Sequence, residues 1–142
     1  MRPDVILRVA SAVAGLQFAA HTWLFVRSTP RHGPAEIAVL DAMKANRFDF
    51  LGAQRSYWDF YYGYGLSAAF VVLIEAVLLW QLAALARTSP SAVTPMVALV
   101  LCFNIGHMIL MARYFFITPI IPDALIAICL GLVLWKGVSA TN

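Results

Sequence analysis

The chain has 142 residues, of which 62% are apolar and only 12% are charged, and its formal net charge is +3. Water-soluble domains average about 45–50% apolar and about 25% charged residues, so this composition excludes an ordinary soluble domain. A disordered chain is excluded as well, because disorder requires low hydrophobicity. No basic run is interleaved with aromatic residues, so nucleic acid is not an expected partner. We therefore predict one transmembrane domain over residues 1–142.

The first predicted helix covers residues 5–26, an apolar run interrupted by Arg8, Gln17 and His21. Its length corresponds to a rise of roughly 33 Å, enough to cross a hydrocarbon core of about 30 Å. A secretory signal peptide is the alternative, because Arg2 and Arg8 accompany the apolar stretch. The small residues expected at a cleavage site are missing, however, so we expect a retained membrane span.

The long polar loop, residues 27–56, follows this helix. Pro34 suits the first turn of a helix, and Glu36 is favourable there because of the helix dipole. Apolar residues then recur at a roughly helical spacing. We predict a short amphipathic helix over about 35–46 that lies on the membrane or caps the bundle, and a solvated loop is the alternative.

Three further apolar segments predict membrane-spanning helices over about 57–86, 94–113 and 120–138. Each segment is near the length that a span needs. The connections between them are short, so consecutive helices should be antiparallel neighbours. The expected fold is therefore all-α: an integral membrane four-helix bundle with up-down-up-down topology, whose long first loop contains the short amphipathic helix.

Small residues recur at four-residue spacing on two of these helices, as Ser11, Gly15 and Ala19 and as Gly65 and Ala69. This spacing permits close approach of helix backbones, within one chain or between protomers. A homo-oligomer or a larger membrane complex therefore stays open, and membrane lipids are expected partners in either case.

Polar side chains within a membrane span are costly, so each one is a candidate functional residue. Gln17 and His21 are separated by four residues, and Asn104 and His107 by three, so each pair shares one helix face. The tyrosines that begin the second span share a stripe with Glu75. The ligand-binding candidates are Gln17, His21, Tyr61, Tyr64, Glu75, Asn104 and His107.

Three interpretations of these candidates stay open. The side chains could surround a pocket that binds a lipophilic small molecule or lipid, with the tyrosines at its mouth. They could also perform acid–base chemistry on a lipophilic substrate, as a membrane enzyme. In the third interpretation they only hydrogen-bond between helices, in a structural or assembly subunit without chemistry of its own. No cofactor is expected, because His21 and His107 lie at different depths and no zinc-ligand spacing accompanies them.

Aromatic residues are dense at the start of the second span, from Tyr57 to Tyr64. An interfacial belt of Trp and Tyr is the ordinary explanation for such a segment. Asp59 lies about 160° around the helix from Glu75, so these two carboxylates should not form a pair. We expect instead that Arg55, Asp59 and Arg113 form an ion-pair network that fixes how the loop docks onto the bundle.

Three motifs carry a family resemblance: RFDFLG at 47–52, RSYWDFYYGYG at 55–65, and RYFF at 113–116 followed by Pro119. They resemble an uncharacterised family of small bacterial four-helix membrane proteins, in which an RFDF-x-G segment leads into YWDFY and a Gly-rich helix start. The resemblance extends over nearly the whole chain. It implies the four-helix fold and a location in the bacterial inner membrane, and it implies no activity.

Overall fold

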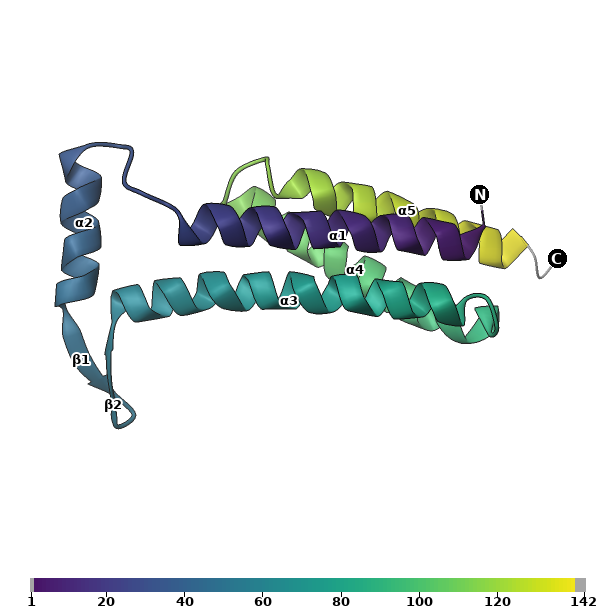
Figure 1. Cartoon of the computed structure of the whole chain (residues 1–142), viewed down its shortest axis with the longest axis horizontal. Helices are drawn as coiled ribbons and strands as arrows, with labels where there is room; N and C mark the ends of the chain where they lie inside the picture. The colour runs from purple at the N-terminus through teal and green to yellow at the C-terminus, as the bar shows by residue number, and fades with distance from the viewer. Residues whose placement is uncertain (1, 140–142) are drawn as a thin grey trace. The chain divides into compact units, whose positions relative to one another are not determined.

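The computed structural model describes residues 2–139, with side chains described as far as Lys136. Its five helices confirm the predicted all-α class, and the long helices pack as a bundle (Figure 1). The elements in chain order are α1 (Pro3–Val26), α2 (Pro34–Ala45), β1 (Arg47–Phe50), β2 (Ala53–Ser56), α3 (Tyr57–Leu85), α4 (Pro90–Tyr114) and α5 (Ile120–Ser139).

Within the described residues, three helices are long and apolar enough to cross a membrane, namely α1, α3 and α4. The chain is therefore a multi-pass helical protein with three candidate membrane spans. The fourth predicted span, over 120–138, forms the 20-residue helix α5.

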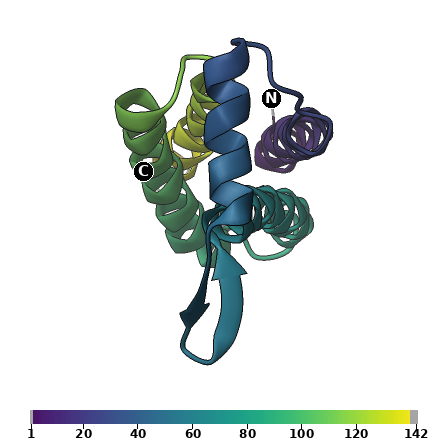
Figure 2. The same ribbon diagram turned by 90° about the vertical axis from the view of Figure 1, so that its left-hand side faces the viewer.

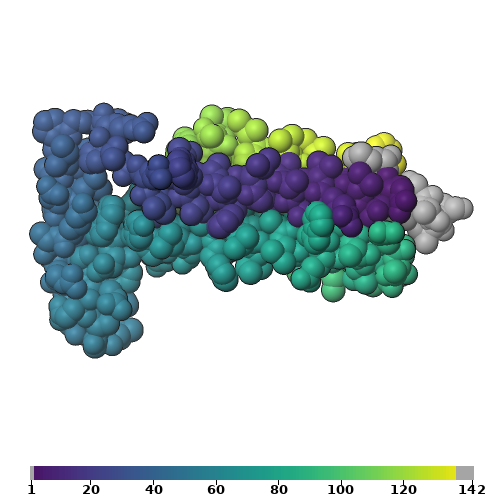
Figure 3. Space-filling model, in the orientation of Figure 1, coloured from purple at the N-terminus to yellow at the C-terminus, as the bar shows by residue number. Residues whose placement is uncertain are grey.

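The chain divides into two compact units. One combines Met1–Ala19 with Val72–Asn142 and is called the bundle unit, and the other is Ala20–Val71 and is called the loop unit. In the bundle unit α1 and α3 lie side by side and form one face (Figure 3). The buried Ser11 hydroxyl joins these helices, because it donates to the carbonyl oxygen of Ala76 at 2.7 Å.

The core of the bundle unit follows steps of three and four residues along each helix. Such alternating steps keep side chains on one helix face, as in coiled coils. The buried residues in these steps are Leu7, Ala10 and Ala14 on α1, Glu75, Leu79 and Leu82 on α3, Val93, Val97, Val100 and Asn104 on α4, and Asp123, Ile126, Leu130 and Val133 on α5. On three of the four helices, an apolar stripe thus continues into a buried polar residue.

The helix α4 begins at Pro90, four residues before the predicted start at residue 94. Pro90 occupies the first turn, where a missing backbone N–H costs nothing because that group has no partner within the helix. Pro95, next to the predicted start, lies inside the helix.

The loop unit begins with the end of α1 and contains the predicted short helix, which forms α2. Gly33 precedes α2 with a φ of 88°. The Glu36 carboxylate then accepts hydrogen bonds from the backbone N–H groups of Arg31 at 2.6 Å and His32 at 2.7 Å. The carboxylate therefore fixes the chain that leads into the first turn of α2.

Residues 47–56, which were expected to be irregular, form an antiparallel hairpin between α2 and α3 (Figure 2). The register pairs Arg47 with Ser56 and Phe50 with Ala53. Leu51 and Gly52 make the turn with φ values of 53° and 84°. Positive φ at both central residues is typical of the type I′ turn, whose twist matches that of the paired strands.

Candidate functional site

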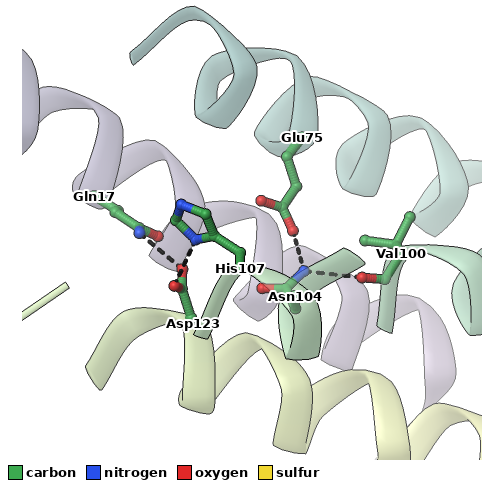
Figure 4. A network of polar contacts seen from close by, with 6 residues as sticks. All are labelled: Gln17, Glu75, Val100, Asn104, His107 and Asp123. Carbon is green, nitrogen blue, oxygen red and sulfur yellow. Dashed lines mark hydrogen bonds and ion pairs between the residues drawn. The ribbon is translucent and has the colours of Figure 1, made fainter. Parts of the chain in front are cut away.

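Polar side chains from four helices of the bundle unit lie close together (Figure 4). Asn104 follows the buried Val100 by four residues on α4, and Asp123 precedes the buried Ile126 by three residues on α5. The helical phase of the apolar core therefore directs these side chains inward. The group is called the polar layer and consists of Gln17 on α1, Glu75 on α3, Asn104 and His107 on α4, and Asp123 on α5.

Asp123 joins three helices within the polar layer. One carboxylate oxygen accepts from Gln17 Nε2 at 2.8 Å, and the other lies 2.7 Å from His107 Nδ1. Asp123 is only 2% exposed, and a buried carboxylate with a partner on each oxygen is well satisfied. Since a carboxylate oxygen accepts, Nδ1 of His107 carries the proton of this bond.

His107 is held in one orientation by this bond and by the ring of Phe103, which stacks on it at 6.0 Å between centroids. The side chain of His107 is 26% exposed. In a neutral imidazole with its proton on Nδ1, the other nitrogen, Nε2, is an acceptor. The geometry therefore leaves Nε2 as the atom that could exchange a proton.

Glu75 is paired with Asn104, and both side chains are buried. The Asn104 amide nitrogen donates to a Glu75 carboxyl oxygen and, at 3.0 Å, to the carbonyl oxygen of Val100. The bond to Val100 lies within α4 and fixes the amide against its own helix. Asn104 therefore links the carboxyl group of α3 to α4.

Two amide oxygens of the polar layer lack a donor. Among the described residues, Gln17 Oε1 and Asn104 Oδ1 are buried without a hydrogen-bond partner. An unsatisfied buried acceptor costs roughly 1–3 kcal/mol. With two carboxyl groups and one imidazole alongside, the polar layer has more acceptors than donors, so it favours a group that donates hydrogen bonds.

The remaining predicted ligand-binding residues, His21, Tyr61 and Tyr64, belong to the loop unit. His21 Nε2 lies 3.1 Å from the carbonyl oxygen of Gly65, and its ring stacks on Phe25 at 5.8 Å. Both tyrosines are exposed, and Tyr64 helps to line an open surface recess. The structure therefore brings together four of the seven predicted residues and places three in other surroundings.

Gly65 permits a close contact between α1 and α3 in the loop unit. A Cβ atom built there would lie 2.1 Å from the ring of Phe25. The same ring also packs against Tyr61 at 5.7 Å and Tyr62 at 5.3 Å. His21 therefore takes part in a tight helix–helix contact.

Asp59 has local partners at the start of α3. Its carboxylate accepts from the Ser56 backbone N–H at 2.8 Å and from the Ser56 hydroxyl at 3.0 Å, and the Asp59 N–H points back to that hydroxyl at 3.2 Å. This reciprocal arrangement is a capping box. Arg55 donates to Gln54, and Arg113 lies over the ring of Tyr114. The ion-pair network of Arg55, Asp59 and Arg113 stays a prediction, because Arg113 belongs to the other unit.

Sequence reasoning missed Asp123, which is not among the predicted site residues. A signal was present: Asp123 precedes Ile126, Leu130 and Val133 in steps of three, four and three residues. That spacing assigns it to the buried stripe.

Among residues 2–139, no group of three or more His, Cys, Asp or Glu side chains is placed to hold a metal ion. No family model, no curated protein and no solved structure matches the chain.

Proposed function

We propose that this chain is a four-span protein of the bacterial inner membrane that binds a lipophilic small molecule or lipid at the polar layer. The helix α5 supplies the fourth span, because its 20 residues rise roughly 30 Å. The location follows from the family resemblance of the RFDFLG and RSYWDFYYGYG motifs. Membrane lipids are then the surrounding partners of the exposed apolar side chains.

The observation that carries this proposal is the pair of buried amide oxygens without a donor, Gln17 Oε1 and Asn104 Oδ1. A ligand with a hydroxyl or amine group would satisfy them, and its apolar part would remain among the helices. Binding sites of this kind combine an apolar lining with a few placed polar groups. The expected ligand is therefore a lipophile that carries at least one hydrogen-bond donor.

A second candidate function is acid–base catalysis on a lipophilic substrate. It is favoured by the bond between His107 Nδ1 and Asp123, which leaves Nε2 free to take or give a proton. In this case His107 is the acid–base group and Asp123 is the positioning residue. The third alternative, a structural or assembly subunit, uses the same hydrogen bonds only to join helices.

Native mass spectrometry of the purified full chain tests the proposal. Gln17→Met removes the unpaired oxygen together with the Nε2 donor to Asp123, while it keeps the length of the side chain. Gln81→Met is a control at an exposed position of α3. We expect a lipophile to remain bound to the wild type and to Gln81→Met, and to be lost from Gln17→Met.

Equal retention by Gln17→Met would contradict binding at the polar layer. If the wild type retains no lipophile and Gln17→Met lowers only the melting temperature, the structural alternative is supported instead. The melting temperature is therefore measured on the same samples.

A further inference from the structure

The turn of the β1–β2 hairpin carries an apolar side chain in an unfavourable backbone conformation. Leu51 is 93% exposed and has a φ of 53°. Residues with a Cβ atom rarely adopt positive φ, and Asn or Gly is usual at this position of a type I′ turn. Residues held in sparsely populated backbone conformations cluster at functional sites. A leucine here is therefore unsuited both to the turn and to water.

The hairpin leads directly into the first turn of α3, as Figure 1 shows. Phe48 packs on Tyr57 at 5.0 Å, and Phe50 packs edge-on against Phe60 at 5.3 Å. Since α3 is a candidate membrane span that begins at Tyr57, the hairpin is level with the end of that span. Aromatic side chains at this level are typical of the membrane–water interface.

The charges of the hairpin complement an anionic membrane surface. Arg47 and Arg55 are both exposed, and each guanidinium donates to the carbonyl oxygen of Gln54, which leaves several N–H donors available. Asp49 is engaged in the turn, where its carboxylate accepts from the Gly52 N–H at 3.0 Å. Guanidinium groups bind phosphate well because they donate two parallel hydrogen bonds.

We propose that the β1–β2 hairpin is a membrane anchor specific for anionic lipids. Phe50 and Leu51 enter the boundary between headgroups and acyl chains, and Arg47 and Arg55 bind lipid phosphates. The residues of this surface do not belong to the polar layer, so the membrane anchor can be tested independently of the ligand proposed there. An exposed apolar turn beside arginines is thereby explained, because lipid covers the leucine.

The test uses the full chain in nanodiscs made of equal parts phosphatidylcholine and phosphatidylglycerol. Leu51→Cys carries an environment-sensitive fluorophore in a Cys102→Ala, Cys129→Ala background. Gln54→Cys provides the control site on the strand face opposite to Phe50, because Gln54 pairs with Asp49. We expect lipids with a shallow spin label to quench the probe at 51 much more than the probe at 54. Equal quenching at the two sites, or none, would overturn insertion.

Unlabelled variants provide an independent measurement by hydrogen exchange of the hairpin amides. Leu51→Asn improves the turn but removes the apolar contact, so we expect faster exchange in nanodiscs despite a better turn. Phosphatidylglycerol should protect the hairpin amides against hydrogen exchange. Arg47→Gln and Arg55→Gln should each weaken this protection by about fivefold. Unchanged protection of the hairpin amides in Leu51→Asn would refute the lipid anchor. Protection that appears in detergent only as the protein concentration rises would also refute it, and would indicate self-association of the chain.

Discussion

Asp123 and His107 are sixteen residues apart in the chain, yet their side chains are joined at 2.7 Å across α5 and α4. The bond lies in register with the apolar core, since Asp123 shares its helix face with Ile126 and Leu130. A charged or strongly polar pair at such a position couples the two helices, because neither partner can be left alone in an apolar environment without cost.

Asp123→Ala should destabilise the bundle unit, because it removes the partners of both His107 and Gln17. We expect a loss of about 1–3 kcal/mol in the free energy of unfolding. Denaturant-induced unfolding in detergent measures it. Asp41→Ala on α2 is the control, since Asp41 is an exposed acid. A similar loss in both variants would contradict a special role for Asp123.

Gly65→Ala should weaken the contact between α1 and α3 in the loop unit. The added Cβ would lie 2.1 Å from the Phe25 ring, so the ring must move away from its place beside Tyr61 and Tyr62. Overpacking of this kind costs about 1–3 kcal/mol. At Gly63 nothing lies within 4 Å of an added Cβ, which makes Gly63→Ala the matched control in thermal melts. Equal melting temperatures of the two variants would contradict the close contact between Gly65 and Phe25.

Ser11→Ala should lower the free energy of unfolding by less than Asp123→Ala or Gly65→Ala does. It removes the buried hydrogen bond from the Ser11 hydroxyl to the Ala76 carbonyl. Hydrogen bonds between membrane helices average about 0.6 kcal/mol and reach at most about 1.7 kcal/mol. Ser67→Ala, at an exposed position of α3, removes a hydroxyl group in the same way. Unfolding curves of the two variants should differ by about the average value, and identical curves would show that the Ser11 bond contributes nothing.

The start of α2 should respond to acid. The backbone N–H of His32, and then that of Arg31, donate to Glu36 and lower the pKa of this carboxyl below its ordinary value of 4.5. A lowered pKa means that the charged form stabilises the folded turn above pH 4.5, and that this contribution disappears as the pH falls through the lowered value. The amide proton shifts of Arg31 and His32, measured by NMR during a pH titration, should follow the Glu36 carboxyl.

Glu36→Gln separates this effect from general acid unfolding. The variant should show no such titration of the Arg31 and His32 amides and should order the turn less well at neutral pH. Asp41→Asn should leave the titration unchanged. Amides that titrate identically in Glu36→Gln would show that another group is responsible.

The sequence predicts the helices well because long apolar runs leave few alternatives. Gln17, Glu75, Asn104 and His107 could be found because polar side chains are rare within such runs. Asp123 could not be found in the same way, because it follows Pro122 at the start of a helix, where an acid is ordinary. The hairpin was missed because its Leu51-Gly52 turn lacks the usual Asn-Gly signal.

His21 and Tyr61 illustrate a second limit. Helical phase predicts which side chains share a face of one helix, but it does not predict which neighbouring helix that face meets. His21 shares its phase with Gln17, yet it pairs with Gly65 of the loop unit while Gln17 pairs with Asp123. Contacts between helices depend on the tilt and packing of whole helices, which periodicity alone does not give.

The polar layer also has a consequence for biosynthesis. In the proposed four-span arrangement, α4 supplies the partner of each neighbouring acid, Asn104 for Glu75 and His107 for Asp123. An acid alone in a lipid-exposed helix is costly, so α3 and α5 each insert more favourably beside α4 than by themselves. Only residues 115–119 separate α4 from α5. These two helices can therefore leave the translocon as a pair in which Asp123 already has its hydrogen-bond partner on α4.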